Sequence, residues 1–424
     1  MSVATVAEEV LGRIDESRED LAQLALRLGN TYSPWGSERI LAEEVLAWYR
    51  ENGVPAELMP ITESRANVVA RLRGSGGGPS IAFNAHLDTE ASGPEYDRLM
   101  AVPDPNRVGG RREQDRLFGH TILNDRGCMS LFMIAGRALL DAGAPLAGDV
   151  ILASVAGETG AAPVDEYEGV EYEGKGFGSS YLVRHGHRGD YALVAETTDF
   201  GMCWFNCGAA YYKVTLRGRN MYTPRLLRPE TLGEHPNAIV KAAAVVEALE
   251  AWAREFEAAR SGPTACGEVR PKAQVGAIRG GLPWRPNRSS TFCALYVDVR
   301  TLPGEDVEEV TAALRSAVDA TGTGAEVELI MFKPGAVAEG VEPLADAVRD
   351  AHRQVRGTDP APQVETAVVS MWRDTNIYNN AGIPSLTFGP SRGRADVQGE
   401  GFFALDDLVD AAKMYALTAL RIAG

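Results

Sequence analysis

Alternating apolar and polar positions divide the first half of the chain into helices and strands. Helical spacing is found over residues 6–28, 37–51 and 127–142, and strand-like apolar runs over 67–72, 80–84 and 149–156. The alternation of strand and helix predicts an α/β fold with a mixed, mostly parallel sheet flanked by helices.

The pattern changes after residue 206. Strand-like alternation over 210–217 and 294–300 is combined with helical spacing over 237–259 and 307–318. These elements predict a small α+β domain inserted into the α/β fold. We therefore expect a catalytic metal-binding domain made of residues 1–205 and 327–424, interrupted by a smaller domain at 206–326.

Composition narrows the classes of partner. The chain has 424 residues and a formal net charge of -16, so nucleic acid and anionic membranes are not expected to bind it. The N-terminus lacks the apolar core of a secretory signal, and no apolar run approaches the roughly 20 residues of a membrane span. Five scattered cysteines favour reduced thiols and a cytoplasmic location.

Three polar groups stand at the ends of predicted strands or beside them. They are His86, Asp125 and Glu196. One imidazole and two carboxylates make an N/O ligand set that suits Zn²⁺ or Mn²⁺ and leaves a position open for water. This set is typical of a metal-dependent hydrolase.

Five segments in a fixed order resemble one superfamily. They are His86-x-Asp88, Asn124-Asp125, Gly157-Glu158, Ala195-Glu196-Thr197, and Gly382-Ile383-Pro384 with Gly389-Pro390. This order resembles the superfamily of metal-dependent aminoacylases, acetylornithine deacetylases and glutamate carboxypeptidases. The resemblance implies a catalytic domain interrupted by a lid domain that often dimerises, and hence a homo-oligomer built through the lids. It also implies two neighbouring metals bridged by Asp125.

The resemblance also implies roles for single residues. His86, Asp125 and Glu196 would hold one metal. Asp88 would orient His86 from behind, and Glu158 would be the general base that takes a proton from water.

Two positions depart from the superfamily at the second metal. Thr159 stands where the second metal's glutamate is usual, and Asp396 stands where its histidine is usual. Threonine is a poor ligand beside carboxylate or imidazole. We therefore predict one divalent metal per active site, with Asp396 left as a candidate for a weak second site or for the substrate.

The predicted lid domain also differs from the superfamily pattern. Tyr222 replaces a superfamily histidine that stabilises an oxyanion. Residues 283–286, with Trp284 and Arg285, stand where the superfamily usually has an asparagine-containing substrate strip, and Arg288 is a neighbouring arginine. Tyr222 and Trp284 have a plainer interpretation, in which they only pack. Aromatic rings beside arginines would suit a small, flat, anionic aromatic substrate, because arginine binds carboxylates and stacks on rings.

Three functions follow from these observations. The leading hypothesis is hydrolytic deamination of an electron-poor aromatic amine, 5-nitroanthranilate to 5-nitrosalicylate and ammonia, as in a divergent subtype that these departures resemble. The second is hydrolysis of an N-acyl amino acid or dipeptide, with Tyr222 as oxyanion donor. The third is a metal-poor binding protein that has lost catalysis.

Overall fold

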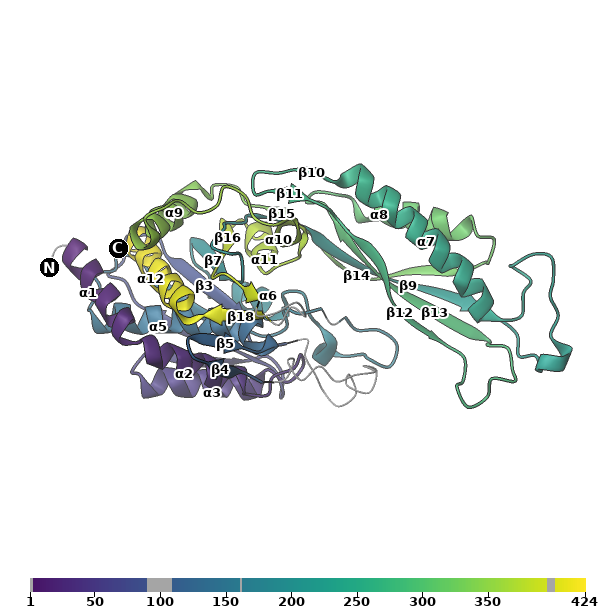
Figure 1. Ribbon diagram of the computed structural model, residues 1–424, viewed down its shortest axis with the longest axis horizontal. Coiled ribbons are helices and arrows are strands. Elements are labelled where there is room, and N and C mark those ends of the chain that lie inside the picture. Colours follow the sequence, from purple (N-terminus) through teal and green to yellow (C-terminus); the bar gives the residue numbers. More distant parts are fainter. Residues whose placement is uncertain (1–2, 90–108, 161, 395–400) are drawn as a thin grey trace. The chain divides into compact units, whose positions relative to one another are not determined.

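The chain divides into two compact units (Figure 1). The computed structural model describes residues 3–89, 109–160, 162–394 and 401–424. The larger unit contains Met1–Phe205, Val337–Glu365 and Arg373–Gly424, and the smaller contains Asn206–Ala336 and Thr366–Trp372. The smaller unit continues past residue 326, where the sequence places its end, because the strand that begins at Glu326 pairs within its sheet.

A six-stranded sheet forms the centre of the larger unit. Its strands lie in the order β1 (Ala56–Pro60), β2 (Ala66–Leu72), β6 (Val150–Val155), β3 (Ile81–His86), β7 (Tyr191–Ala195) and β16 (Ser385–Phe388). The last four run parallel to one another, while β1 and β2 are antiparallel to their neighbours. The sheet is thus mixed and mostly parallel, as predicted.

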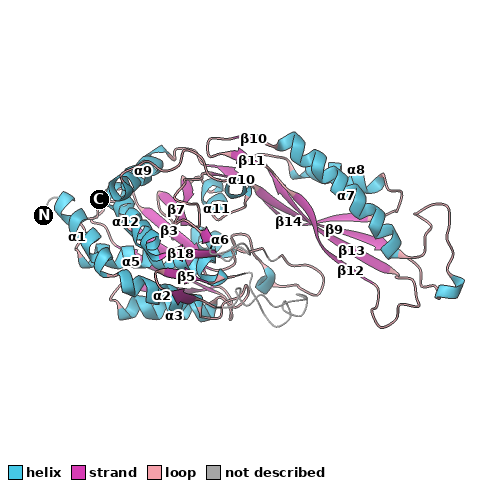
Figure 2. Ribbon diagram, in the orientation of Figure 1, coloured by secondary structure: helices cyan, strands magenta, loops and turns pink. Residues whose placement is uncertain are grey.

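Helices cover both faces of this sheet (Figure 2). The helices of the larger unit are α1 (Val3–Glu16), α2 (Arg18–Gly29), α3 (Arg39–Glu51), α5 (Gly127–Asp141), α6 (Phe177–Arg184), α9 (Glu342–Arg356), α11 (Thr375–Asn380) and α12 (Leu405–Ile422). Along β3, Phe83 faces the core shared with α5 and α12, whereas Ala82 faces a smaller core shared with α6 and α11. Both faces are apolar because a parallel sheet is buried on both sides.

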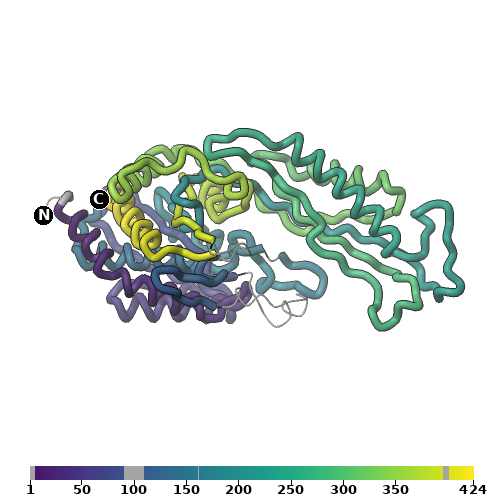
Figure 3. Tube along the Cα trace, in the orientation of Figure 1, coloured from purple at the N-terminus to yellow at the C-terminus, as the bar shows by residue number. Residues whose placement is uncertain are grey.

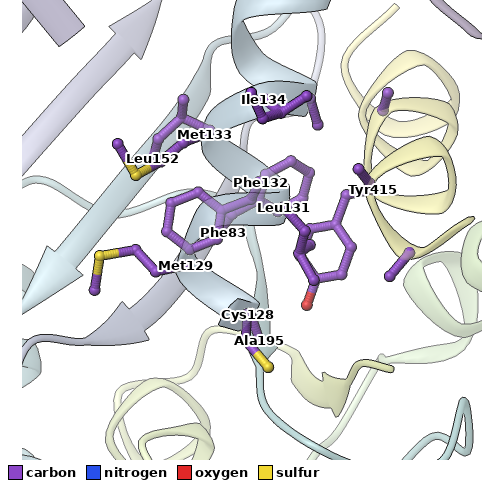
Figure 4. Close-up of a cluster of buried hydrophobic side chains, with 14 of the residues drawn as sticks. Phe83, Cys128, Met129, Leu131, Phe132, Met133, Ile134, Leu152, Ala195 and Tyr415 are labelled. Atoms are coloured by element: carbon purple, nitrogen blue, oxygen red, sulfur yellow. The ribbon is translucent and has the colours of Figure 1, made fainter. Parts of the chain in front are cut away.

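The larger core is centred on aromatic rings from three elements (Figure 4). The ring of Phe83 on β3 lies 4.8 Å from that of Tyr415 on α12 and 6.5 Å from that of Phe132 on α5, between ring centroids. All three side chains are fully buried. Each such residue removes enough apolar surface from water to contribute roughly 1.5–3 kcal/mol, so this cluster fixes β3 against the helices.

One predicted helix is in fact two. The chain breaks at Ser17, between α1 and α2, although apolar spacing continues across it. The Ser17 hydroxyl donates to the Arg13 carbonyl, and Arg137 of α5 donates to that hydroxyl at 2.6 Å. A tertiary contact therefore sets the break. Helix α1 packs on α12, and in Figure 3 these first and last helices lie on the same side of this unit.

The smaller unit is a four-stranded antiparallel sheet with two helices in its core. The strand order is β12 (Ala273–Gly280), β13 (Phe292–Thr301), β9 (Gly208–Arg217) and β14 (Glu326–Lys333). Helices α7 (Ala238–Arg260) and α8 (Val307–Asp319) share its hydrophobic core. Asn237 caps α7 by accepting a hydrogen bond from the Ile239 N–H, and Asp306 caps α8 in the same way.

Several short strands and one short helix are also present in the described chain. They are β4 (Arg111–Glu113), β5 (Arg116–Phe118), β8 (Phe205–Asn206), β10 (Gly262–Pro263), β11 (Glu268–Val269), β15 (Ala336–Val337), α10 (Thr366–Ser370), β17 (Gly393–Arg394) and β18 (Gly401–Ala404). Within the described ranges, every helix is too short or too polar to cross a bilayer.

Candidate metal centre

His86 is the last residue of β3 and is held from two sides. Its Nδ1 lies 2.8 Å from the backbone carbonyl of Asp88, so the ring donates there and its Nε2 points the other way. The Nε2 atom lies 3.0 Å from the side-chain oxygen of Asn124 and 4.0 Å from a carboxylate oxygen of Glu158. Donation from Nδ1 to the Asp88 carbonyl leaves Nε2 as the ring atom that a metal could use.

Three side chains could bind one cation together. His86, Glu158 and Glu196 each offer a ligand atom, and these atoms lie within 4.8 Å of one another. Glu196 directly follows β7, and Glu158 follows β6 by three residues. Because β6, β3 and β7 are adjacent and parallel, the three ends meet at one edge of the sheet.

Asp125 lies beside this cluster but is not one of its three members. Its Oδ2 accepts a hydrogen bond from the His86 N–H at 3.4 Å, and the peptide bond that precedes it is cis. Within the part of the chain that the structure describes, its Oδ1 is buried and has no hydrogen-bond partner. A buried oxygen left in this state beside one imidazole and two carboxylates fits a hard or borderline divalent cation.

Asp88 joins the His86 and Glu158 segments. Its Oδ1 accepts from the Glu158 N–H at 3.0 Å, and its Oδ2 accepts from the Thr159 N–H at 2.8 Å and from the Thr159 hydroxyl. Its Oδ1 also lies 3.6 Å from Nδ1 of His86, which is a charge contact rather than a hydrogen bond.

Burial and charge act in opposite directions on these groups. Burial by itself would lower the pKa of His86, but Asp88, Asp125 and Glu158 outweigh it and raise that pKa well above its usual value. Burial would raise the pKa of Asp88, yet His86, Thr159 and the Glu158 N–H lower it. Burial raises the pKa values of Asp125 and Glu158. Such clustering of perturbed acids and a base is common at functional sites.

Two cations near the carboxylates were not anticipated from the sequence. The Arg373 guanidinium lies 3.1 Å from Glu196 and is almost fully buried. Lys175 is also buried, and its backbone N–H donates to the Glu158 and Thr159 carbonyls. Its charge lowers the pKa of Glu158, against the larger effect of burial. The available signal for Arg373 was a charged Arg373-Asp374 pair after an apolar stretch, shortly before the Gly382 segment.

Asp374 belongs to a buried polar network on the α6 and α11 side of the sheet. Ser179 donates to its carboxylate at 2.6 Å, and Asn84 of β3 donates to Ser179 at 2.9 Å and to Tyr378 at 3.0 Å. Burial, and next the charge of Glu158, raise the pKa of Asp374 to about 8.

The predicted substrate residues of the lid lie in the smaller unit. The Arg288 guanidinium stacks over the exposed ring of Tyr222 at 5.3 Å from its centroid, and these two residues also form an isolated β-bridge. Trp284 is 78% exposed and Arg285 is exposed too, so Trp284 packs little against the part of the chain that the structure describes. Asp396 lies outside the described residues.

A buried cluster of imidazole and carboxylates at the ends of parallel strands is typical of metal-dependent hydrolases. The model of Peptidase family M20/M25/M40 matches residues 82–421, and the chain belongs to this family. It is accordingly a metal-dependent hydrolase that acts on C–N bonds.

Similar proteins cover most of the chain. A Pyrobaculum aerophilum protein assigned as a LysW-lysine/LysW-ornithine hydrolase is 26% identical and covers 75% of this chain and 77% of its own. The N-formyl-4-amino-5-aminomethyl-2-methylpyrimidine deformylase of Bacillus subtilis is 23% identical, and the match covers 89% of this chain and 88% of the deformylase. The solved dipeptidase Dug1p of Saccharomyces cerevisiae shares the fold, with a TM-score of 0.70, 12% identity and coverage of 100% and 99%.

Proposed function

We propose that the protein hydrolyses the C–N bond of a small anionic aromatic amine, converting 5-nitroanthranilate and water to 5-nitrosalicylate and ammonia. His86, Asp125 and Glu196 would hold one divalent metal, Mn²⁺ or Zn²⁺, as the cofactor. When bound, this metal supplies Lewis acidity that makes a water molecule nucleophilic at neutral pH.

Glu158 handles the protons of this reaction. Its carboxylate takes a proton from the attacking water as the C–O bond forms at the ring carbon that bears the amine. The ring nitro group holds the negative charge that develops. Glu158 then returns a proton to the departing nitrogen as the C–N bond breaks, so that ammonia leaves. The position of Glu158, 4.0 Å from the His86 imidazole, supports this role.

The observation that supports an aromatic substrate is the stacking of the Arg288 guanidinium on the Tyr222 ring. At neutral pH a tyrosine hydroxyl donates a hydrogen bond but carries no positive charge, so it is a weaker oxyanion clamp than a protonated histidine. A nitro-substituted ring needs less help of this kind, because it stores the charge itself. The exposed ring and guanidinium of this pair offer a stacking surface and a carboxylate ligand.

An assay of released products tests the proposal. We expect the Mn²⁺- or Zn²⁺-loaded protein to release ammonia from 5-nitroanthranilate and to leave anthranilate, which lacks the nitro group, unchanged. The Glu158→Gln variant is the matched control. Turnover of anthranilate at a similar rate would contradict the assigned role of the nitro group.

Hydrolysis of an N-acyl amino acid or dipeptide is the second candidate. It is favoured by the relatives, which include a deformylase and a dipeptidase. The same assay, run on N-formyl and N-acetyl amino acids and on dipeptides, distinguishes the two by the released carboxylate or amino acid. A protein that turns over none of these substrates would instead support the degenerate binding protein.

We also propose that the smaller units pair to form a homo-oligomer in which Tyr222 reaches the partner's metal site. Support comes from β12, an edge strand whose residues from Ala277 to Gly280 are exposed, and from the exposed apolar side chains of Ile278, Leu282 and Trp284 next to it. Unpaired edges and apolar patches favour association.

Complementation tests the role of Tyr222 across subunits. Glu158→Gln and Tyr222→Ala chains, each inactive alone, should regain activity when they are co-expressed and form mixed oligomers. No recovery in mixed oligomers that are verified by mass would place Tyr222 in its own chain's reaction. The cytoplasmic location stays a prediction, supported by five buried cysteines that form no disulfide.

A further inference from the structure

Thr159 stands at the position where the superfamily usually has a ligand of the second metal, but its side chain contacts Asp88 instead. The hydroxyl donates to Oδ2 of Asp88, and the backbone N–H of the same residue donates to that oxygen at 2.8 Å. Thr159 is buried, with 6% of its surface exposed, and Asp88 is fully buried. The hydroxyl proton is therefore used within the protein, in a site that excludes water from competing for it.

Asp88 in turn connects two segments of the metal centre. Its Oδ2 accepts a hydrogen bond from the Thr159 hydroxyl. Its Oδ1 accepts one from the Glu158 N–H at 3.0 Å and lies 3.6 Å from Nδ1 of His86. The backbone carbonyl of Asp88 accepts a hydrogen bond from the His86 Nδ1–H. The Asp88 side chain thus ties the backbone of Glu158 and Thr159 to the residue whose carbonyl holds the His86 ring, and its negative charge lies next to that ring.

We propose that Thr159 is a positioning residue, which holds the Asp88 carboxylate in place and, through it, fixes the His86 ring for metal binding. This inference rests on the metal-dependent function proposed above. It assigns to Thr159 a role in the affinity of one metal, rather than the role of ligand to a second.

The residue type fits this role. A β-branched side chain has few χ1 rotamers, so the threonine hydroxyl is directed at Asp88 with little loss of entropy. Valine has nearly the same shape but cannot donate, whereas serine donates without the methyl group. These two substitutions therefore separate the hydrogen bond from the packing.

Metal affinity in the absence of substrate tests the proposal. The intact protein and its Thr159→Val and Thr159→Ser variants are stripped of metal, and Mn²⁺ and Zn²⁺ binding is measured by competition with a chromophoric chelator. Partners behind a metal ligand are typically worth 10–100-fold in affinity. We expect Thr159→Val to bind about 10–100-fold more weakly, and Thr159→Ser to bind within a few-fold of the intact protein.

A spectroscopic measurement separates positioning from general damage. With Co²⁺ in the site, Thr159→Val should shift the visible ligand-field bands and Thr159→Ser should retain them, while the melting temperatures of the metal-free proteins stay close. If Thr159→Val does not fold, Thr159→Ala removes the same hydroxyl and takes its place.

Three results would overturn the inference. The first is equal affinity and an unchanged Co²⁺ spectrum for Thr159→Val. The second is no metal binding by the intact protein. The third is a stoichiometry that falls from two metals to one in Thr159→Val, which would make Thr159 a ligand. Since no substrate is used, a protein that shows the expected affinities but no deamination would refute the proposed substrate and leave the role of Thr159 supported.

Discussion

Replacing Asp374 by asparagine should remove a large part of the pH dependence of stability in the metal-free protein. Burial raises the pKa of Asp374 to about 8, from an ordinary value of 3.8. A group whose pKa is raised by folding stabilises the folded state fully below its unfolded pKa, and this stability is lost as the pH rises through the folded pKa. The folded protein is therefore penalised progressively between pH 4 and pH 8.

The magnitude follows from the two pKa values. Each pH unit in this window costs roughly 1.4 kcal/mol, so the loss between pH 5 and pH 8 is at most about 4 kcal/mol. Asparagine has nearly the same shape as aspartic acid and keeps an oxygen that can accept from Ser179. We expect the advantage of Asp374→Asn over the intact protein in unfolding free energy to grow from pH 5 to pH 8 by about this amount.

Urea unfolding at several pH values, with a chelator present, measures this difference. Asp190→Asn is the control, because hydrogen bonds from Ser80 lower the pKa of Asp190. Its contribution is lost only as the pH falls through that lowered value, so this variant should be destabilised by a constant amount from pH 5 to pH 8. Parallel curves for Asp374→Asn and the intact protein would refute the raised pKa and the reasoning from burial.

Further substitutions test the centre and its support. Glu158→Gln should lose about 10²–10⁴ in rate while nearly retaining its metal, whereas His86→Ala should lose both, as shown by metal analysis alongside the activity assay. Arg65→Met breaks an ion pair with Glu38 in which both side chains are fully buried, and it should cost about 3–5 kcal/mol, measured as a fall in the urea midpoint. Tyr222→Phe should weaken substrate binding and rate but leave the oligomer intact in light scattering.

The strands and helices that could be predicted are those whose patterns are local. β3 ends in the candidate ligand His86, β7 is an apolar run directly followed by Glu196, and α7 begins at an asparagine cap. The edge strand β12 escaped prediction because five consecutive residues at its end, Gly276–Gly280, show no buried alternation. Its pairing with β13 defines it, and that contact is not local.

The candidate site shows the same limit. Strand-end positions indicated His86 and Glu196, since parallel strands bring their ends to one edge of the sheet. Arg373 could not be placed against Glu196 because 177 residues separate them, and their contact forms only when the chain folds. Similarly, the hydrogen bond from the Thr159 hydroxyl to Asp88 joins two segments that are 71 residues apart in the sequence, so no local pattern could predict it.

The insertion of the smaller unit has a consequence for folding during synthesis. Phe83 packs on Tyr415, and β16 and α12 are made only after the whole smaller unit. The ribosome therefore finishes a complete small sheet and its two helices while β3 and α5 still lack part of their core. Contacts across so long a loop form slowly, and exposed apolar strands in partly made chains are prone to aggregation. The first two hundred residues should accordingly depend on chaperones until α12 arrives.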